Sequence, residues 1–438
     1  MNPLRACAAA PASALFLSLC VSPAPPAAAQ ASVIFVHPDG ASAATWAAAR
    51  ALHAGPDGEL YWDQLPHVAV YKGHLNNSLT SSSNGGATAH ASGVTPGYDA
   101  FGRSEGGVAE ADLLDEKGGS LLLGRAAIAA GIPTGLVQSG IAPEPGTAVF
   151  LVDHESRKDH EAIALKLIES GARVLMSGGE KHFLPQGTRG VHGMGVRTDG
   201  RDLVEEARER GYTVVRTRVE LLLLPADTQK VLGLFAEGAT FNDATEEVNR
   251  ERGLEPFDPA APTLAEMTAA AIRVLAQDGD AFFLVVEEEG TDNLGNKNNA
   301  AGTLEAARRA DAALGVAKTW VDQNPDTLLI TAADSDGGGL RMSGFPESAI
   351  RGQAPAVTPE TARNGAPMDG IDGTSTAPFR AKPNAAGKRL PFAIVWSHLN
   401  DVSGGVVVRA IGKNADQVRG TMSNVEVSDL MRATLFGE

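Results

Sequence analysis

The 438-residue sequence contains only two cysteines, Cys7 and Cys20, and both lie within its first thirty residues. Without that segment, the chain has no thiol to form a disulfide, act as a nucleophile or bind a metal. Aromatic residues make up only 5% of the sequence, which also lacks a basic run and a heptad repeat. The formal net charge of -16 argues against nucleic-acid binding, because such a surface repels a phosphate backbone.

The first thirty residues have the pattern of a secretory signal peptide. Arg5 gives a weakly positive start, residues 14–21 form a short apolar run, and residues 26–30 place small side chains before Ala31. The apolar run is far shorter than the roughly 20 residues that span a bilayer. We therefore predict a cleaved signal peptide over residues 1–30, a secreted or periplasmic protein and no membrane span.

The remaining sequence alternates short apolar strands with amphipathic helices. Strands are predicted at residues 31–37, 133–138, 172–176, 212–216, 282–286, 327–331 and 390–396. Helices are predicted at residues 41–53, 158–170, 200–210, 263–277 and 302–324. Short apolar strands joined by helices indicate an α/β fold, with a large, mainly parallel central sheet in a three-layer α/β/α sandwich.

Residues 31–438 are predicted to form a single domain. Residues 337–388 are rich in glycine, proline, alanine and threonine and have little periodicity. We interpret them as a long loop or cap over a site rather than as a domain boundary. In sheets of this kind, ligands bind beyond the carboxyl ends of the strands.

Acidic side chains follow four of the predicted strands. The set is Asp39, Glu287 to Glu289, Asp292, Asp334, Asp336 and Asp401. Gathered at one edge of the sheet, like charges would repel and raise one another's pKa unless cations neutralise them. We therefore predict a divalent metal site, although a single acid such as Glu288 or Asp336 is better explained as a helix cap or a solvated loop residue.

The order of several motifs resembles the alkaline phosphatase family over almost the whole chain after residue 30. VIFVHPDG is similar to the family's first strand and its metal-binding aspartate, here Asp39. SSSNGGATAHASGV is similar to the segment with the nucleophilic hydroxyl, which the resemblance assigns to Ser83, with Ser82 as the alternative. DHESRKDHEAI, ahead of GARVLMSGGE, offers Arg157 as the phosphate-binding arginine, although a surface ion pair is its simpler role.

Two further motifs of this resemblance concern metal binding. LVVEEEGTD matches a glutamate and an aspartate five residues apart, Glu287 and Asp292, and TAADSDGGG matches a metal-binding aspartate at Asp334. Cations suit phosphate-ester chemistry because the electrophile is surrounded by negative oxygens. They also lower the pKa of a serine hydroxyl, which is a weak nucleophile at neutral pH.

The sequence departs from the family where zinc-binding histidines are expected. Asn296, Ser335 and Asp401 stand at those three positions. Oxygen donors suit magnesium, calcium or manganese better than zinc, so a variant subgroup with two or three such ions is expected. The predicted metal ligands are Asp39, Glu287, Asp292, Asp334 and Asp401, with Asn296 as a further candidate.

Four histidines lie in or near these motifs and are therefore close to the predicted site. These are His37, His90, His154 and His398. Each could still join the metal ligands, although a supporting or packing role is the expected one. His90 follows Ser83 by seven residues, which on a helix places both on one face.

The resemblance implies a phosphomonoesterase that acts on small phosphate esters. Ser83 would attack phosphorus to give a phosphoserine, and Arg157 would hold the phosphoryl oxygens. Two alternatives remain open: a phosphodiesterase or related ester hydrolase of the same fold, and a non-catalytic relative that binds metal or phosphate. The family often forms dimers, so a homodimer is also possible.

Overall fold

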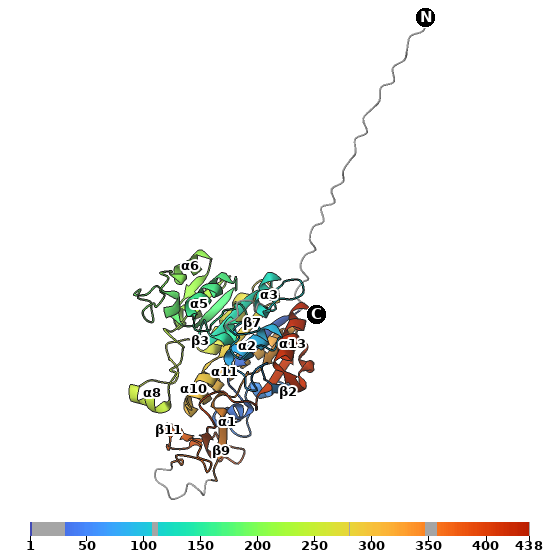
Figure 1. Ribbon diagram of the computed structural model, residues 1–438. Coiled ribbons are helices and arrows are strands. Elements are labelled where there is room, and N and C mark those ends of the chain that lie inside the picture. The colour runs from blue at the N-terminus through green and yellow to red at the C-terminus, as the bar shows by residue number, and fades with distance from the viewer. Residues whose placement is uncertain (2–30, 107–112, 280, 347–356, 438) are drawn as a thin grey trace.

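The computed structural model describes residue 1 and residues 31–106, 113–279, 281–346 and 357–437 (Figure 1). The predicted signal peptide, apart from residue 1, lies outside these ranges, as do residues 347–356 of the predicted cap. Within the described ranges, no helix combines the length and the apolar character that crossing a bilayer requires.

The centre of the molecule is a ten-stranded sheet with the order β15-β2-β14-β8-β1-β7-β3-β4-β6-β5. Its strands are β1 (Ser32–Pro38), β2 (His67–Lys72), β3 (Thr134–Ile141), β4 (Val174–Gly178), β5 (Thr213–Val215), β6 (Val231–Leu234), β7 (Phe283–Glu288), β8 (Thr327–Thr331), β14 (Val407–Gly412) and β15 (Arg419–Ser423). Neighbouring strands run parallel except at β14, which is antiparallel to β2 and β8. This confirms the predicted α/β fold with a large, mainly parallel sheet.

Helices cover both faces of the sheet. One face is covered by α2 (Ser83–Ser92), α3 (Leu123–Ala129), α4 (Pro145–Ala148), α5 (His160–Glu169), α6 (Leu203–Glu209) and α13 (Asn424–Phe436). The other is covered mainly by α1 (Ala43–His53), α9 (Leu264–Leu275) and α11 (Ala300–Gln323). Shorter helices are α7 (Arg218–Leu222), α8 (Glu246–Arg252) and α10 (Gly290–Asn296).

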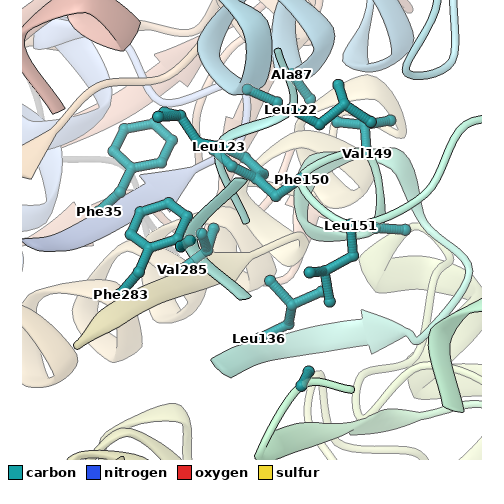
Figure 2. Packing of buried hydrophobic residues seen from close by; sticks show 14 of the residues in the cluster. Phe35, Ala87, Leu122, Leu123, Leu136, Val149, Phe150, Leu151, Phe283 and Val285 are labelled. Atoms are coloured by element: carbon teal, nitrogen blue, oxygen red, sulfur yellow. The ribbon is translucent and has the colours of Figure 1, made fainter. Parts of the chain in front are cut away.

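Side-chain alternation along the strands explains the two layers. On β1, Val33 and Phe35 belong to the core under α2, whereas Ile34 and Val36 belong to the core under α11. Figure 2 shows Phe35, Phe150 and Phe283 close together in the first core. The ring centroids of Phe35 and Phe150 are 5.9 Å apart, and those of Phe150 and Phe283 are 5.8 Å apart. This packing anchors the segment after α4 to β1 and β7.

A second, antiparallel sheet lies apart from the first, next to α1 in Figure 1. Its strands are β9 (Arg341–Gly344), β10 (Met368–Gly370), β11 (Gly373–Thr374), β12 (Phe379–Arg380) and β13 (Pro391–Val395). The segment 337–388, predicted to be a long loop or cap, therefore contributes four short strands. The strand predicted at residues 390–396 exists, but its assignment to the parallel sheet was wrong, since it pairs with β9, β10 and β12. An apolar run does not specify its hydrogen-bonding partners.

Candidate metal centre

The carboxyl ends of four adjacent strands, β8, β1, β7 and β3, meet at one edge of the sheet. Asp39 follows β1 directly, Glu287 lies near the end of β7, and Asp334 follows β8 by three residues. His37 on β1 and Glu287 on β7 are direct register partners. Parallel pairing therefore brings together residues that are 250 positions apart in the sequence.

Five buried side chains gather at this edge, and we call them the Asp39 group: His37, Asp39, Glu287, Glu289 and Asp334. Ligand atoms of His37, Asp39 and Asp334 lie within 4.8 Å of one another, and so do those of Asp39, Glu287 and Glu289. Asp39 is common to both sets. If each set held a cation, the two cations would share Asp39 as a ligand.

Several polar atoms of the Asp39 group have no hydrogen-bond partner among the described residues. They are both carboxylate oxygens of Asp39 and of Asp334, one oxygen each of Glu287 and Glu289, and His37 Nε2. Buried polar atoms are normally hydrogen-bonded, and a buried unpaired charge is costly. Divalent cations would satisfy these oxygens, so the residues present fit metal binding.

The pKa shifts of the acids in the group also favour bound cations. Burial, followed by the charges of nearby carboxylates such as Glu287 and Glu144, raises the pKa of Glu289 well above its usual range. Burial and the neighbouring Asp39 do the same to the pKa of Asp334. Without a counter-charge, these groups could not all ionise together.

The ring of His37 lies among three carboxylates of the group. Its Nδ1 is 3.3 Å from Glu287 Oε1, and its Nε2 is 3.9 Å from Asp39 Oδ1 and 4.0 Å from Asp334 Oδ1. Burial lowers the pKa of His37, but the hydrogen bond with Glu287 and the charge of Asp39 outweigh it, so the pKa is raised overall. His90 lies behind it, with Nε2 2.8 Å from the Tyr71 hydroxyl.

A second cluster, which we call the Asn296 group, consists of Asp292, Asn296 and Asp401. Asp292 and Asn296 are four residues apart on α10, so their side chains share a face. Asn296 Nδ2 donates to both oxygens of Asp292, at 2.9 and 3.0 Å, and to Asp401 Oδ1 at 3.0 Å. Its Oδ1 accepts from Gly338 N at 2.8 Å. The amide nitrogen, and not the oxygen predicted as a ligand, therefore faces the carboxylates.

Two serines at the start of α2 differ sharply in their contacts. Ser82 is the N-cap residue, because its hydroxyl accepts from Gly85 N at 3.1 Å and donates to Tyr98 O. The hydroxyl of Ser83 has no hydrogen bond with any described residue. The same helical turn touches Asp334, since a Cβ atom on Gly86 would lie 2.3 Å from Asp334 Oδ2. Of the two hydroxyls, that of Ser83 is the free one.

Arg157 is held by a carboxylate that the sequence did not single out. Its Nη2 donates to Glu144 Oε2 at 2.8 Å, and its side chain is 37% exposed. Burial lowers the pKa of Arg157, but the charges of Glu144, Glu289 and Asp39 raise it overall. Arg157 therefore lies within electrostatic reach of the Asp39 group, and its partner is not a neighbouring acid of α5.

The other acids and histidines considered above have separate roles. Asp336 accepts from Arg341 Nη1 at 2.6 Å, and Glu288 accepts from Ser139 Oγ at 2.6 Å. His154 Nδ1 is bonded within its own turn at 3.2 Å from Ser156 N, and His398 lies in an exposed stretch.

Sequence reasoning passed over Glu289 and gave His37 only a supporting role. His37 precedes Asp39 by two residues, and Glu289 follows Glu287 by two. Side chains two positions apart on a strand point to the same face, so period-two spacing was the available signal. Glu144 carried no such signal because it approaches from the separate segment before α4.

Two glycines allow the close approach of these segments. At Gly146, an added Cβ would lie 1.4 Å from Glu287 Oε1. At Gly40, which has a φ of +68°, it would lie 2.7 Å from Asp292 Oδ1. Any larger side chain at either position would displace a carboxylate of the centre.

A sequence profile described as alkaline phosphatase matches residues 30–436. The repressible alkaline phosphatase of Saccharomyces cerevisiae is 29% identical over 333 residues, which cover 71% of this chain and 56% of the yeast protein. The chain thus spans little more than half the length of that curated relative.

Solved structures of two bacterial alkaline phosphatases have the same fold. That of Thermus thermophilus has a TM-score of 0.69 and 24% identity, with coverage of 97% of this chain and 96% of that chain. A histidine-to-aspartate variant of the TAB5 enzyme, with magnesium bound, has a TM-score of 0.67 and 19% identity, with coverage of 93% and 98%. At these identities, the likeness shows the fold alone.

Proposed function

This chain belongs to the alkaline phosphatase family, and we propose on that basis that it hydrolyses phosphate esters of small molecules with the help of divalent metal ions. The observation that carries the proposal is the Asp39 group, whose buried carboxylate oxygens have no hydrogen-bond partners among the described residues and whose Asp334 touches Gly86, in the first turn of the helix that begins at Ser83. A purely structural cluster of acids would be expected to have donors for these oxygens.

Asp39, Glu287, Glu289 and Asp334 would hold the ions. Bound there, divalent cations would offset the charge of the phosphoryl oxygens and lower the pKa of the serine hydroxyl. Magnesium, calcium or manganese suit the sites that only oxygen atoms line. The buried position of the carboxylates limits competition from water.

Ser83 is the proposed nucleophile. Its Oγ forms a bond to phosphorus while the bond from phosphorus to the ester oxygen breaks, the alcohol leaves, and a phosphoserine remains. Water then attacks phosphorus, which releases inorganic phosphate and restores the hydroxyl. Backbone N–H groups at the start of α2 can donate to phosphoryl oxygens, because these groups have no partners within the helix.

Arg157 would bind the phosphoryl group at the same time. A guanidinium has a planar set of donors, so Arg157 can keep its bond to Glu144 while it donates to phosphoryl oxygens. Glu144 fixes the orientation of the side chain before substrate binds. Positioning of this kind reduces the entropy lost on the way to the transition state.

The decisive experiment is covalent labelling by substrate. The wild-type protein, loaded with divalent ions and quenched in acid during turnover of a labelled aryl phosphate, should retain about one phosphoryl group per chain. Ser83→Ala should abolish the label, whereas the matched variant Ser82→Ala should keep it and lose only some stability, by about 1 kcal/mol, through the lost cap. Label that persists in Ser83→Ala would disprove the assignment.

Ester preference and activity as such are tested in the same preparation. A monoesterase should hydrolyse aryl phosphate faster than the corresponding diester, and a diesterase should do the reverse. No hydrolysis of either with magnesium, calcium, manganese or zinc would favour a protein that only binds metal or phosphate.

We also propose export through the predicted signal peptide, and a homodimer remains a proposal by analogy with the family. N-terminal sequencing of protein recovered from the cell exterior or periplasm should begin at Ala31. Sedimentation at micromolar concentration would establish whether the chain is a monomer or a dimer.

A further inference from the structure

We propose that His37 is a direct nitrogen ligand of an ion held between Asp39 and Asp334, so that this site prefers zinc, manganese or cobalt to magnesium or calcium. The inference deepens the proposed function, because it requires that the Asp39 group binds divalent ions. It assigns to His37 a role that neither the sequence motifs nor the oxygen-only ligand set contains.

The distances around Nε2 are too long for hydrogen bonds and short enough for a shared cation. Nε2 lies 3.9 Å from Asp39 Oδ1 and 4.0 Å from Asp334 Oδ1, whereas hydrogen bonds between nitrogen and oxygen are about 2.7–3.2 Å long. A metal bound at about 2.0–2.2 Å from a nitrogen and from carboxylate oxygens spans a gap of this size. All of these atoms are buried and without hydrogen-bond partners among the described residues.

The other ring nitrogen fixes the tautomer that metal binding needs. Nδ1 is 3.3 Å from Glu287 Oε1, to which it can donate its proton. Histidine ligands usually donate the second N–H to a carboxylate or carbonyl, which orients the ring and increases its basicity. With Nδ1–H bonded to Glu287, the lone pair of Nε2 points at two carboxylates, an arrangement that a cation would stabilise.

The surrounding rings hold His37 in this orientation. Its ring stacks on Phe35, with centroids 5.7 Å apart and an interplanar angle of 18°. The ring of His90 meets it edge-on at 5.6 Å and 84°. His90 is directed elsewhere, since its Nε2 is 2.8 Å from the Tyr71 hydroxyl. Among the described histidines, His37 alone belongs to either set of potential ligands.

The two ion sites that share Asp39 would therefore differ in chemistry. The site of His37, Asp39 and Asp334 mixes nitrogen with oxygen, and imidazole is a good ligand for zinc and other transition metals. The site of Asp39, Glu287 and Glu289 has carboxylate oxygens only, as magnesium and calcium prefer.

X-ray absorption at the zinc edge tests the proposal without reference to turnover. Protein stripped with a chelator is given about one zinc per chain, because the site with nitrogen should fill first. The wild-type spectrum should show outer-shell scattering from one imidazole per zinc. His37→Gln should lose this scattering, and the matched variant His90→Gln should retain it.

A second measurement tests how much His37 contributes to zinc affinity. In competition with a chromophoric chelator, His37→Gln should raise the zinc Kd about 10–100-fold and change the calcium Kd much less. Circular dichroism of the stripped variants checks that each has folded. The wild-type spectrum tests the proposal even if His37→Gln does not fold.

The outcomes separate this inference from the proposed function. Zinc that binds to the wild type without imidazole scattering, or with scattering that survives in His37→Gln, overturns the role of His37 and leaves the proposed hydrolase standing. A wild-type protein that binds no divalent ion at all overturns both.

Discussion

The Asp39 group and the Asn296 group are neighbouring clusters of acids that differ in how their oxygens are satisfied, and Asp401 in the second group is only half-buried. In the Asn296 group, one amide nitrogen donates to three carboxylate oxygens from two separate segments. In the Asp39 group, the carboxylate oxygens of Asp39 and Asp334 have no donor among the described residues. The shared amide meets only part of the need in the Asn296 group, because burial and the charge of Asp401 still raise the pKa of Asp292 well above its usual range. The oxygens of Asp39 and Asp334 have no donor at all, so their need for a cation is greater.

This difference locates the cation sites more sharply than the number of acids does. Four strand ends supply carboxylates, but among the buried acids of the described residues only Asp39 and Asp334 have both oxygens without a partner. Asn296 Oδ1 accepts from Gly338 N, so turning the amide to present its oxygen to an ion would place its nitrogen against that N–H. We therefore expect the ions on the Asp39 side.

Replacing the carboxylate common to both ion sites should have the largest effect. Asp39→Asn should reduce kcat/KM by about 10³-fold or more, because both sites lose a charged ligand. Elemental analysis should show fewer bound ions per chain. Asp311→Asn is the matched control, since Asp311 is also buried but bonds Trp62 N, away from the site. Equal losses in the two variants would mean that burial, and not metal binding, explains the effect.

Removing the Asn296 amide should leave the carboxylates of Asp292 and Asp401 without their donor, as two carboxylates of the Asp39 group already are. Asn296→Asp replaces the donor with a third carboxylate, which should destabilise chelator-treated protein by about 3 kcal/mol. Added magnesium or calcium should restore most of this loss and bind with about one extra ion per chain.

Thermal unfolding with and without the ions measures the change, and Asn364→Asp, at an exposed position, controls for the added charge. An unaltered ion count with no rescue by metal would contradict the contrast between the two groups.

A smaller effect is expected at the arginine that lies beside the Asp39 group. Arg157→Lys keeps the charge but loses the planar donors, so kcat/KM should fall about 10–100-fold and inhibition by inorganic phosphate should weaken in parallel. Arg173→Lys, at the ion pair with Asp278, should leave both values unchanged. If Arg157→Lys also left them unchanged, phosphate would not bind on the Asp39 side.

The smallest effect concerns Glu246, a buried acid outside both groups, one oxygen of which accepts from Ala301 N at 2.9 Å. Burial raises the pKa of Glu246 to about 8, and one of its oxygens has no partner among the described residues. Since the folded pKa lies above the unfolded value, the stabilisation by the bound proton is complete below about pH 4.5 and is lost as pH rises toward 8.

Glu246→Gln should remove this pH dependence and raise the Tm at pH 8 by a few degrees, as thermal unfolding at several pH values would show. A Tm difference between Glu246→Gln and the wild type that is the same at pH 5 and pH 8 would show that Glu246 is ionised in the folded protein. Burial alone would then not keep a carboxylate protonated, which contradicts the argument that the buried acids of the two groups need a donor, a proton or a cation.

Much of the fold could be predicted because buried strands carry a strong local signal. The apolar runs that became β1, β7 and β8 were recognised, whereas four strands of the central sheet were missed: β2, with its alternating HVAVYK, the four-residue β6, β14 and the polar β15. Strands with one exposed face have few apolar residues and resemble loops. The partner of β13 was also beyond prediction, because an antiparallel sheet of short strands depends on contacts far apart in sequence.

At the site, the motifs selected the acids but could not reveal their hydrogen bonds. Ser82 and Ser83 are adjacent and chemically identical, and only the helix cap distinguishes them. The orientation of Asn296 depends on Gly338, 42 residues away. Glu144 reaches Arg157 only because the segment before α4 packs on β7.

The sequence alone determined which residue types stand at the ends of the strands, since the apolar period and the order of motifs are local properties. Tertiary structure decided which of those acids have donors and which face one another unpaired, and it placed His37 Nε2 between two of them. The physical reason is that hydrogen-bond satisfaction depends on groups from several distant segments. Their relative positions are fixed only when the strands pair and the helices pack.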